Sequence, residues 1–360
     1  MKPPSLLLLY NEPVLPVDHP DAGSEHDILD TVEDTFKVLK TAGFDVTKLG
    51  INYDPRPLLD VLKKKRPEAV FNLFEGIATQ TGTEVSAAAL LEWLNVPFTG
   101  CPSTALALGR DKIRTKHLLA ASGLPTPDYA IIDALPVPRW RRPWPAIVKP
   151  ACQDASVGID QNSVVTSQKQ LEERVRHVLA TFGPPVLVER FISGREFHVN
   201  ILDGPVADST SGGSALPLVL PLAEIAFENL PEGRWPVYTF TAKWHEESEE
   251  YRTAPLRAPV EIPAEDFARL AAIAQRAYRV LDCRDYARID VRMDRDGKFY
   301  VLEMNPNPYL NSLALVNGLL AIGRTHEQLI VEMALVAVAR GGHSVPSGVV
   351  HVPVGVITAD

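Results

Sequence analysis

One stretch near the end of the sequence decides the fold: residues 286–305 read YARIDVRMDRDGKFYVLEMN. Apolar and polar residues alternate on both sides of Asp294–Gly297, a pattern that predicts two strands joined by a turn. Because side chains alternate between the two faces of a strand, the polar residues of each strand share a face. These residues are Arg288, Asp290 and Arg292 on the first strand, and Glu303 and Asn305 on the second. If the two faces coincide, two carboxylates and an amide oxygen converge beside an arginine.

Such a convergence suggests a metal site. Like charges on paired strands repel each other unless a cation lies between them. Carboxylate and amide oxygens, together with substrate phosphates, are typical ligands of Mg²⁺. Asp290, Glu303 and Asn305 are therefore candidate magnesium ligands. From this stretch alone, a solvated hairpin with scattered ion pairs remains an open alternative.

Two segments upstream could hold a nucleotide. Residues 145–158 read PAIVKPACQDASVG, in which a lysine ends an apolar strand and a small-residue loop offers N–H groups to a phosphate. This loop lacks the Gly-Lys-Ser or Gly-Lys-Thr ending of a Walker A motif. Residues 186–197 read VLVERFISGREF, which predicts two strands joined by a tight turn, with Glu189 and Glu196 near an edge that could contact adenine. Taken alone, each has an ordinary alternative, a surface lysine or a plain hairpin.

The first hundred residues alternate between predicted strands and helices. Such alternation predicts a parallel sheet covered on both faces, which binds ligands at the carboxyl ends of its strands. The loop 75–82 is therefore a candidate binding loop. The predicted strands are 5–10, 44–49, 69–74, 146–149, 186–190 and 196–202, and the predicted helices are one capped by Ser24, then 56–65, 83–94, 106–122, 167–181, 265–281 and 326–340. Residues 203–258 form a long irregular stretch, typical of a lid or a mobile segment.

The order of these motifs points to a family. Asp111 and Lys112 open a helix; then come Val-Lys-Pro with a Ser-Val-Gly loop, Val-Glu-x-Phe-Ile-x-Gly-x-Glu, Arg-x-Asp and Glu-x-Asn. Across residues 70–315 this order closely resembles the ATP-grasp superfamily, and within it the D-alanine–D-alanine ligase family. The resemblance implies an α/β and α+β protein, with an N-terminal parallel-sheet α/β domain before a two-lobed ATP-grasp fold. The implied units are 1–105 (N-terminal domain), 106–193 (small lobe), 194–345 (large lobe with the metal site) and 346–360 (tail).

Carried over residue by residue, the resemblance implies an ATP site. Lys112 and Lys149 would contact phosphates, Ser156 would lie in the loop that closes over them, Glu189, Arg190, Phe191 and Ile192 would hold adenine largely through backbone groups, and Glu196 would take the ribose hydroxyls. Lys243, in the segment TAKW, would reach the terminal phosphate as a catalytic group. Asp290, Glu303 and Asn305 would hold two Mg²⁺ ions, with Mn²⁺ as a substitute. Arg288 would stabilise the oxyanion of a tetrahedral intermediate.

The implied activity is ATP-dependent carboxylate–amine ligation. A substrate carboxylate attacks the γ-phosphate, giving an acylphosphate and ADP, and an amine then displaces phosphate. The expected partners are small-molecule carboxylates and amines, amino acids among them, and the resemblance also suggests a homodimer. Three alternatives stay open: a genuine D-alanine–D-alanine ligase of peptidoglycan synthesis, a nucleotide-binding regulator or scaffold without turnover, and an ATP-grasp kinase or carboxylase.

Two loops depart from the family pattern. Where the family reads His-Gly-x-x-Gly-Glu-Asp-Gly, residues 75–82 read EGIATQTG, and where it reads Asn-Thr-x-Pro-Gly-x-Thr, residues 305–311 read NPNPYLN. Both loops are expected at the amino-acid pockets, so D-alanine is not the substrate that they favour. An acid in place of the histidine favours a substrate with an amine or a guanidine. Glu25, Glu75 and Ser312 are the candidate substrate contacts.

Composition limits the class of protein, its partners and its location. The 360 residues are 46% hydrophobic and 22% charged, as in a globular protein. A formal net charge of −9 at pH 7 argues against nucleic acid as a partner. Three cysteines without a close pair suggest neither a disulfide framework nor a zinc site. The apolar run 6–9 is too short to span a membrane. We therefore expect a cytoplasmic protein without a membrane partner.

Overall fold

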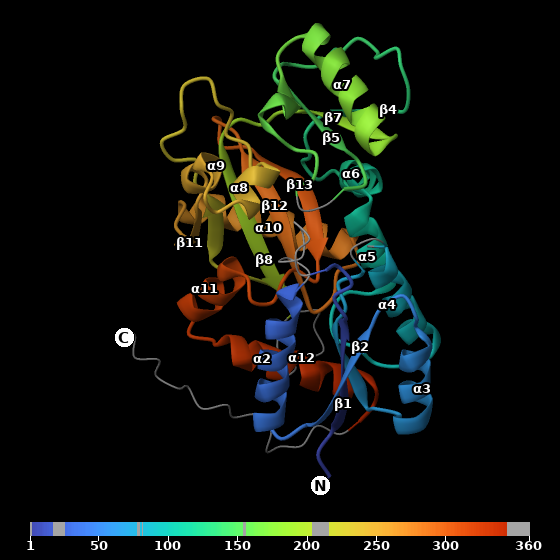
Figure 1. Ribbon diagram of the computed structural model, residues 1–360. Helices are drawn as coiled ribbons and strands as arrows, with labels where there is room; N and C mark the ends of the chain where they lie inside the picture. The colour runs from blue at the N-terminus through green and yellow to red at the C-terminus, as the bar shows by residue number, and fades with distance from the viewer. Residues whose placement is uncertain are drawn as a thin grey trace.

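The computed structural model describes residues 2–16, 26–77, 80, 82–153, 156–203 and 216–343, and these residues form three sheets (Figure 1). In the first, β2 (Asp45–Ile51), β1 (Ser5–Asn11) and β3 (Ala69–Leu73) pair in parallel in that order. Leu6 and Leu8 of β1 face a core that includes α2 (Ile28–Thr41), while Leu7 and Leu9 face one that includes α3 (Arg56–Lys65) and α4 (Thr83–Trp93). The predicted parallel sheet with two covered faces is confirmed. The predicted cap Ser24 lies outside the described residues.

The last helix returns to this first sheet. Helix α12 (His326–Arg340) contacts α2 and β3, and its apolar side chains share a core with Leu6 and Leu8 (Figure 1). It ends where predicted, and a Thr325–Gln328 capping box satisfies its first N–H groups. Although residues 194–345 are predicted as one unit, α12 therefore packs on the N-terminal sheet. The unit boundaries themselves stay a prediction.

The second sheet is antiparallel, in the order β4 (Tyr129–Ile132), β7 (Val186–Arg190), β5 (Ala146–Pro150) and β6 (Val164–Val165). Helix α7 (Gln168–Phe182) covers it, and Ser167 caps this helix through its side chain. Strand β4 is short and half-buried, and the sequence pattern did not predict it.

The third sheet carries the predicted hairpin. Its order is β11 (Leu256–Val260), β10 (Leu222–Ile225), β8 (Arg195–Leu202), β12 (Tyr286–Met293) and β13 (Phe299–Pro306), with β9 (Leu218–Val219) beside β8. Helix α10 (Ala264–Val280) packs on β8, β12 and β13. Helix α11 (Leu313–Ala321), which the sequence pattern did not predict, packs on β8, β10 and β11.

Three predictions about these segments are wrong. Residues 106–122 form two helices, α5 (Ser103–Arg110) and α6 (Lys112–Ala121), because the Asp111 carboxylate accepts a hydrogen bond from the Arg114 N–H at 2.9 Å and starts a new helix. Strands β7 and β8 do not form a hairpin, because they belong to different sheets. From residue 216, the stretch predicted as irregular contains β9, β10, α8 (Phe240–Trp244), α9 (Glu249–Thr253) and the start of β11.

None of the helices in the described ranges is long and apolar enough to cross a bilayer. The cytoplasmic location stays a prediction.

Candidate active site

A cleft lies between the second and third sheets, and we call it the inter-sheet cleft. Strands β5 and β7 form one wall, and β8, β12 and β13 form the other. Twelve of the predicted site residues line it: Lys149, Ser156, Glu189, Arg190, Phe191, Ile192, Glu196, Lys243, Arg288, Asp290, Glu303 and Asn305. Lys112, the remaining predicted phosphate contact, reaches the cleft wall through an ion pair between its Nζ and Glu303 Oε2 at 3.1 Å.

The hairpin aligns its polar side chains through its register. Arg288 pairs with Asn305, and Asp290 pairs with Glu303. Past Asp290 the register shifts, and Val291 pairs with Val301. Because directly opposed residues of an antiparallel pair point to the same face, all four polar side chains face the cleft. The predicted convergence of two carboxylates, an amide and an arginine is confirmed.

Asp290 is the most connected of these groups. Arg288 donates to it from Nε at 2.7 Å and from Nη2 at 2.9 Å, and Asn305 donates from Nδ2 at 3.1 Å. His198, on the neighbouring strand β8, places Nε2 4.0 Å from Asp290 Oδ1. A bidentate arginine holds the carboxylate plane in a fixed orientation. Asp290 is thus positioned to present its oxygens toward the cleft.

The donor set fits Mg²⁺. Asp290 and Glu303 supply carboxylate oxygens, and Asn305 supplies an amide oxygen, as a magnesium ion that also binds phosphates requires. Burial alone would raise the pKa of Glu303. The charges of Lys112 and Lys149 outweigh this effect and lower that pKa overall, so the carboxyl is held ionised. In the described part of the chain, no three His, Cys, Asp or Glu side chains cluster as metal ligands. A magnesium ion here therefore depends on Asn305 and on oxygens from the nucleotide.

Glu189 is buried between two lysines. Its Oε2 lies 2.6 Å from Lys149 Nζ, and Lys116 also contacts its carboxylate. Lys116 is 1% exposed and donates to Thr126 Oγ1 at 2.9 Å. Burial raises the pKa of Glu189, but the two lysines outweigh it and lower that pKa overall. Sequence reasoning missed Lys116, although its place one turn after Lys112 puts both lysines on one helix face.

Arg292 holds the connection between the two sheets. It donates to Glu196 Oε2 from Nε at 2.8 Å and from Nη2 at 2.6 Å, and from Nη1 to the Ile192 carbonyl at 2.7 Å. Its guanidinium also stacks 4.7 Å from the Phe191 ring centroid. The sequence placed Arg292 on the correct face but assigned it no role. It fixes the segment that is predicted to hold adenine.

Residues 235–240 lie against the loop of the second sheet that is predicted to contact phosphate. Ser156 donates from Oγ to the Tyr238 carbonyl at 3.0 Å, and the Phe240 N–H donates to the Ile159 carbonyl at 3.1 Å. Helix α8 follows directly and brings Lys243 to the cleft. This part of the predicted lid therefore bridges the two walls.

The predicted substrate contacts do not all meet. Glu75 lies outside the inter-sheet cleft and lines a separate small hollow with Tyr286 and Asn307. Ser312 precedes α11 as its N-cap and lines neither space among the described residues. Glu25 falls outside the described ranges.

Comparison with known proteins places the chain. A family model described as the D-ala D-ala ligase C-terminus matches residues 118–334. An uncharacterized protein of Sinorhizobium fredii is 34% identical over 267 residues, or 72% of each chain. The D-alanine–D-alanine ligase of Gloeobacter violaceus is 32% identical over 300 residues, or 81% of this chain and 88% of that one.

A solved structure shares the fold. The D-alanine–D-alanine ligase of Bacillus anthracis in complex with ATP superposes with a TM-score of 0.68 at 18% identity, over 94% of this chain and 98% of that one. The chain therefore belongs to the D-alanine–D-alanine ligase family of the ATP-grasp superfamily, and it is an ATP-dependent carboxylate–amine ligase.

Proposed function

We propose that this enzyme uses MgATP to join two amino acids, or an amino acid and a small amine, through an acylphosphate. The arrangement that carries the proposal is the shared face of Arg288, Asp290, Glu303 and Asn305 in a cleft that Lys149 and Lys243 also line. Transfer of a phosphoryl group needs several cations and fixed dipoles around the charge that develops. This face brings such groups together at one place.

The reaction balances in two steps. An oxygen of the first substrate's carboxylate bonds to the γ-phosphorus as the bond to ADP breaks. The nitrogen of the second substrate then bonds to the acyl carbon, loses a proton, and displaces phosphate as the C–O bond breaks. Arg288 is assigned to the oxyanion between these last events, because its guanidinium is fixed by Asp290 at the cleft surface.

The other residues bind and orient the nucleotide. Lys112, Lys149 and Lys243 would contact phosphates, and Ser156 would lie in the loop above them. Asp290, Glu303 and Asn305 would hold Mg²⁺, which neutralises phosphate charge during transfer. Both Arg292 contacts use Glu196 Oε2, so Oε1 is the oxygen proposed to accept the ribose hydroxyls. The adenine would lie against Phe191 and Ile192, with backbone groups of Glu189 and Arg190 at its edge.

D-alanine as both substrates is the second candidate. It is favoured by the name of several relatives at 30–32% identity, D-alanine–D-alanine ligase. The acid at position 75 and the altered loop 305–311 favour another amino acid. A regulator without turnover is less consistent with the site, since a protein that only binds nucleotide has little use for Arg288 at the acyl position. A homodimer remains part of the proposal.

The test is product formation across amino acids. ADP and phosphate release with MgATP would be measured with amino acids singly and in pairs, and products identified by mass spectrometry. We expect one pair to stimulate release and yield a new amide. Arg288→Ala should lower kcat by about 10²–10³ with little change in the KM for ATP, because it removes an interaction made in the transition state.

Arg176→Ala, on the exposed side of α7, is the matched control and should leave kcat unchanged. Amide formation at the wild-type rate by Arg288→Ala would show that the arginine has another role. If ATP binds and no amino acid stimulates release, the proposed substrate class is wrong. A dipeptide formed from D-alanine alone would favour the second candidate.

A further inference from the structure

The hollow that contains Glu75 adjoins the inter-sheet cleft along the hairpin, and we call it the Glu75 hollow. Tyr286, which lines it, precedes Arg288 by two residues on β12, and Asn307 follows Asn305 by two residues. Since a strand advances about 3.3 Å per residue, the backbone of Tyr286 lies about 7 Å along β12 from that of Arg288. A substrate that reacts beside Arg288 could therefore extend into the hollow.

Two acids line this hollow, and one of them is paired with an arginine. Glu84 lines it beside Glu75, and Arg110 Nη1 holds Glu84 Oε1 at 2.8 Å. No hydrogen bond or ion pair reaches the Glu75 carboxylate from any residue that the structure describes. The Glu75 side chain is open to solvent on one side, yet the protein atoms that crowd it, and next the charge of Glu84, raise its pKa to about 7. A cation in the hollow would relieve both effects.

Asn72 gives an independent sign of a ligand. It lines the hollow, is only 4% exposed, and its Nδ2 has no hydrogen-bond partner among the described residues. Its Oδ1 already accepts from the Phe74 N–H at 3.2 Å, which fixes the direction of the amide. Buried donors are normally paired. This donor therefore points to an acceptor oxygen on a bound molecule.

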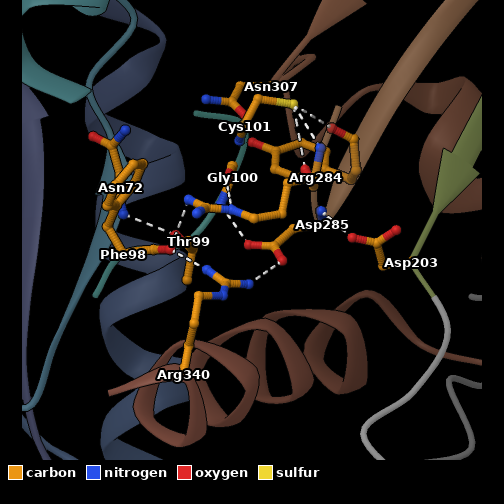
Figure 2. Close-up of polar contacts among 11 residues, drawn as sticks. Asn72, Phe98, Thr99, Gly100, Cys101, Asp203, Arg284, Asp285, Asn307 and Arg340 are labelled. Carbon is orange, nitrogen blue, oxygen red and sulfur yellow. Dashed lines mark hydrogen bonds and ion pairs between the residues drawn. The ribbon is translucent and has the colours of Figure 1, made fainter. Parts of the chain in front are cut away.

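Loop 99–101 contacts the backbone of Asn72 and the side-chain amide of Asn307 (Figure 2). The Asn72 N–H donates to Thr99 Oγ1 at 2.9 Å, and Asn307 Oδ1 accepts from the Cys101 N–H at 2.7 Å. Gly100 permits this approach, because a Cβ there would lie 2.5 Å from Asn307 Oδ1. The wall of the hollow is thus formed before any substrate binds.

We infer that the Glu75 hollow is the subsite for a cationic side chain, an ammonium or a guanidinium, on one of the two amino-acid substrates. Glu75 binds the cation, and Asn72 Nδ2 donates to an oxygen of the same substrate. This assignment rests on the proposed function. The α-ammonium of an amino acid does not suit the subsite, because it lies only about 2.5 Å from its own carboxyl carbon, whereas Tyr286, which lines the hollow, stands about 7 Å along β12 from Arg288. A side chain with three or four methylenes spans that separation.

The experiment compares substrates that differ only in charge. Lysine with norleucine, and arginine with citrulline, would be tested in both enantiomers with a set of second amino acids, by ADP release and by calorimetric binding in the presence of a non-hydrolysable ATP analogue. We expect the charged member to bind more tightly. Glu75→Gln should weaken it by about tenfold, the loss of one charge-assisted hydrogen bond at a partly exposed site, and leave the neutral member and ATP unchanged.

Glu265→Gln, an exposed acid in the first turn of α10, is the matched control and should change none of these values. Equal binding of charged and neutral members, or equal weakening of both by Glu75→Gln, overturns the subsite. The calorimetric measurement does so even without turnover. Amide formation from neutral amino acids alone would overturn the subsite and leave the ligase function standing. Charge-selective binding without amide formation would support the subsite and reject the proposed reaction.

Discussion

His198 is a buried histidine in the wall of the inter-sheet cleft. Burial lowers its pKa to about 4; Asp290 opposes this shift, and Arg288 and Lys243 add to it. The imidazole is therefore neutral at pH 7 in the folded protein. A neutral histidine beside Asp290 adds no positive charge to a site that already holds an arginine and several lysines.

This shift makes a prediction about stability. Below pH 6.5 the unfolded chain protonates His198, whereas the folded protein does so only near pH 4. The stability that depends on a neutral His198 is thus complete above pH 6.5 and is lost as pH falls toward 4, by up to about 3 kcal/mol. Urea unfolding of the ligand-free wild type and of His198→Asn at pH 7.5, 6 and 5 would measure it. We expect the wild type to lose more stability than the variant; parallel curves would contradict the pKa assignment.

Residues on one strand were easier to predict than residues that meet across elements. Arg288, Asp290, Glu303 and Asn305 follow from strand alternation alone, because a pleated strand fixes which side chains share a face. Lys116, His198 and Arg292 owe their environment to partners from other elements. No local pattern reports those partners. Ser312 illustrates the same limit, since its place depends on the start of a helix that the pattern did not reveal.

At the scale of elements, the passage from β7 to β8 connects the two walls of the cleft. Gly194 starts this passage into β8, and a Cβ there would lie 2.0 Å from the Met293 carbonyl oxygen at the end of β12. The contacted atom belongs to the backbone, so it cannot swing aside as a side chain would. Close approach between these two strands therefore requires a glycine.

Gly194→Ala should lower the free energy of unfolding by about 1–3 kcal/mol, because β8 or β12 must shift to admit the methyl group. Chemical denaturation would measure the change. Gly82→Ala is the matched control, since a Cβ at Gly82 meets no atom of the described residues within 4 Å and should have little effect. Equal midpoints for Gly194→Ala and the wild type would show that the sheet adjusts without cost.

Element prediction succeeded where one period dominates. The helix 56–65, the strands of the first sheet and the hairpin have clear patterns and capping or turn residues. Residues 106–122 keep a helical pattern through Asp111, and only the Asp111 side chain, bonded to the Arg114 N–H, breaks the helix. Helix α11 is apolar around most of its circumference, so it shows no amphipathic period. Two strands close in sequence look like a hairpin whether or not they pair, as β7 and β8 show.

Across the whole molecule, a polar cluster ties the N-terminal sheet to the third sheet (Figure 2). Asp285, which precedes β12, accepts from the Gly100 N–H at 2.7 Å and pairs with Arg340 of α12. Arg340 also donates to the Phe98 carbonyl at 2.6 Å, and Arg284 donates to the Gly100 carbonyl at 2.8 Å. Loop 98–101, which lies beside the Glu75 hollow, is therefore bonded both to the segment before β12 and to α12.

Arg340→Ala should reduce stability by about 1.5–3 kcal/mol, since it leaves the buried Asp285 carboxylate without its charged partner. The cluster contacts the loop beside the Glu75 hollow and not the strands β5 and β7 that are proposed to bind the nucleotide. We therefore expect the KM for the amino-acid substrate to rise more than the KM for ATP. Denaturation and steady-state kinetics would test this pair of effects. A rise in both constants to the same extent would place the cluster's influence on the whole cleft.

Motif order predicted the family, and the comparisons bear it out. The packing of α12 on the first sheet could not be predicted, because the apolar pattern of a helix shows that it is buried but not which sheet it packs on. The same holds for the contact between Asp285 and Arg340, which lie 55 residues apart. Contacts between residues so far apart in the sequence depend on how all the elements pack together.

The hairpin β12–β13 has one further consequence. Arg288 and Tyr286 stand two residues apart on β12, so the strand sets the spacing between the proposed reaction point and the Tyr286 wall of the Glu75 hollow. We therefore expect the enzyme to select its substrate by the length of the side chain that carries the cation. Homologous diamino acids that differ by one methylene should differ in rate although their charges are identical. A change of preferred length would then require residues 286 and 307 to change, while the phosphate end of the hairpin stayed the same.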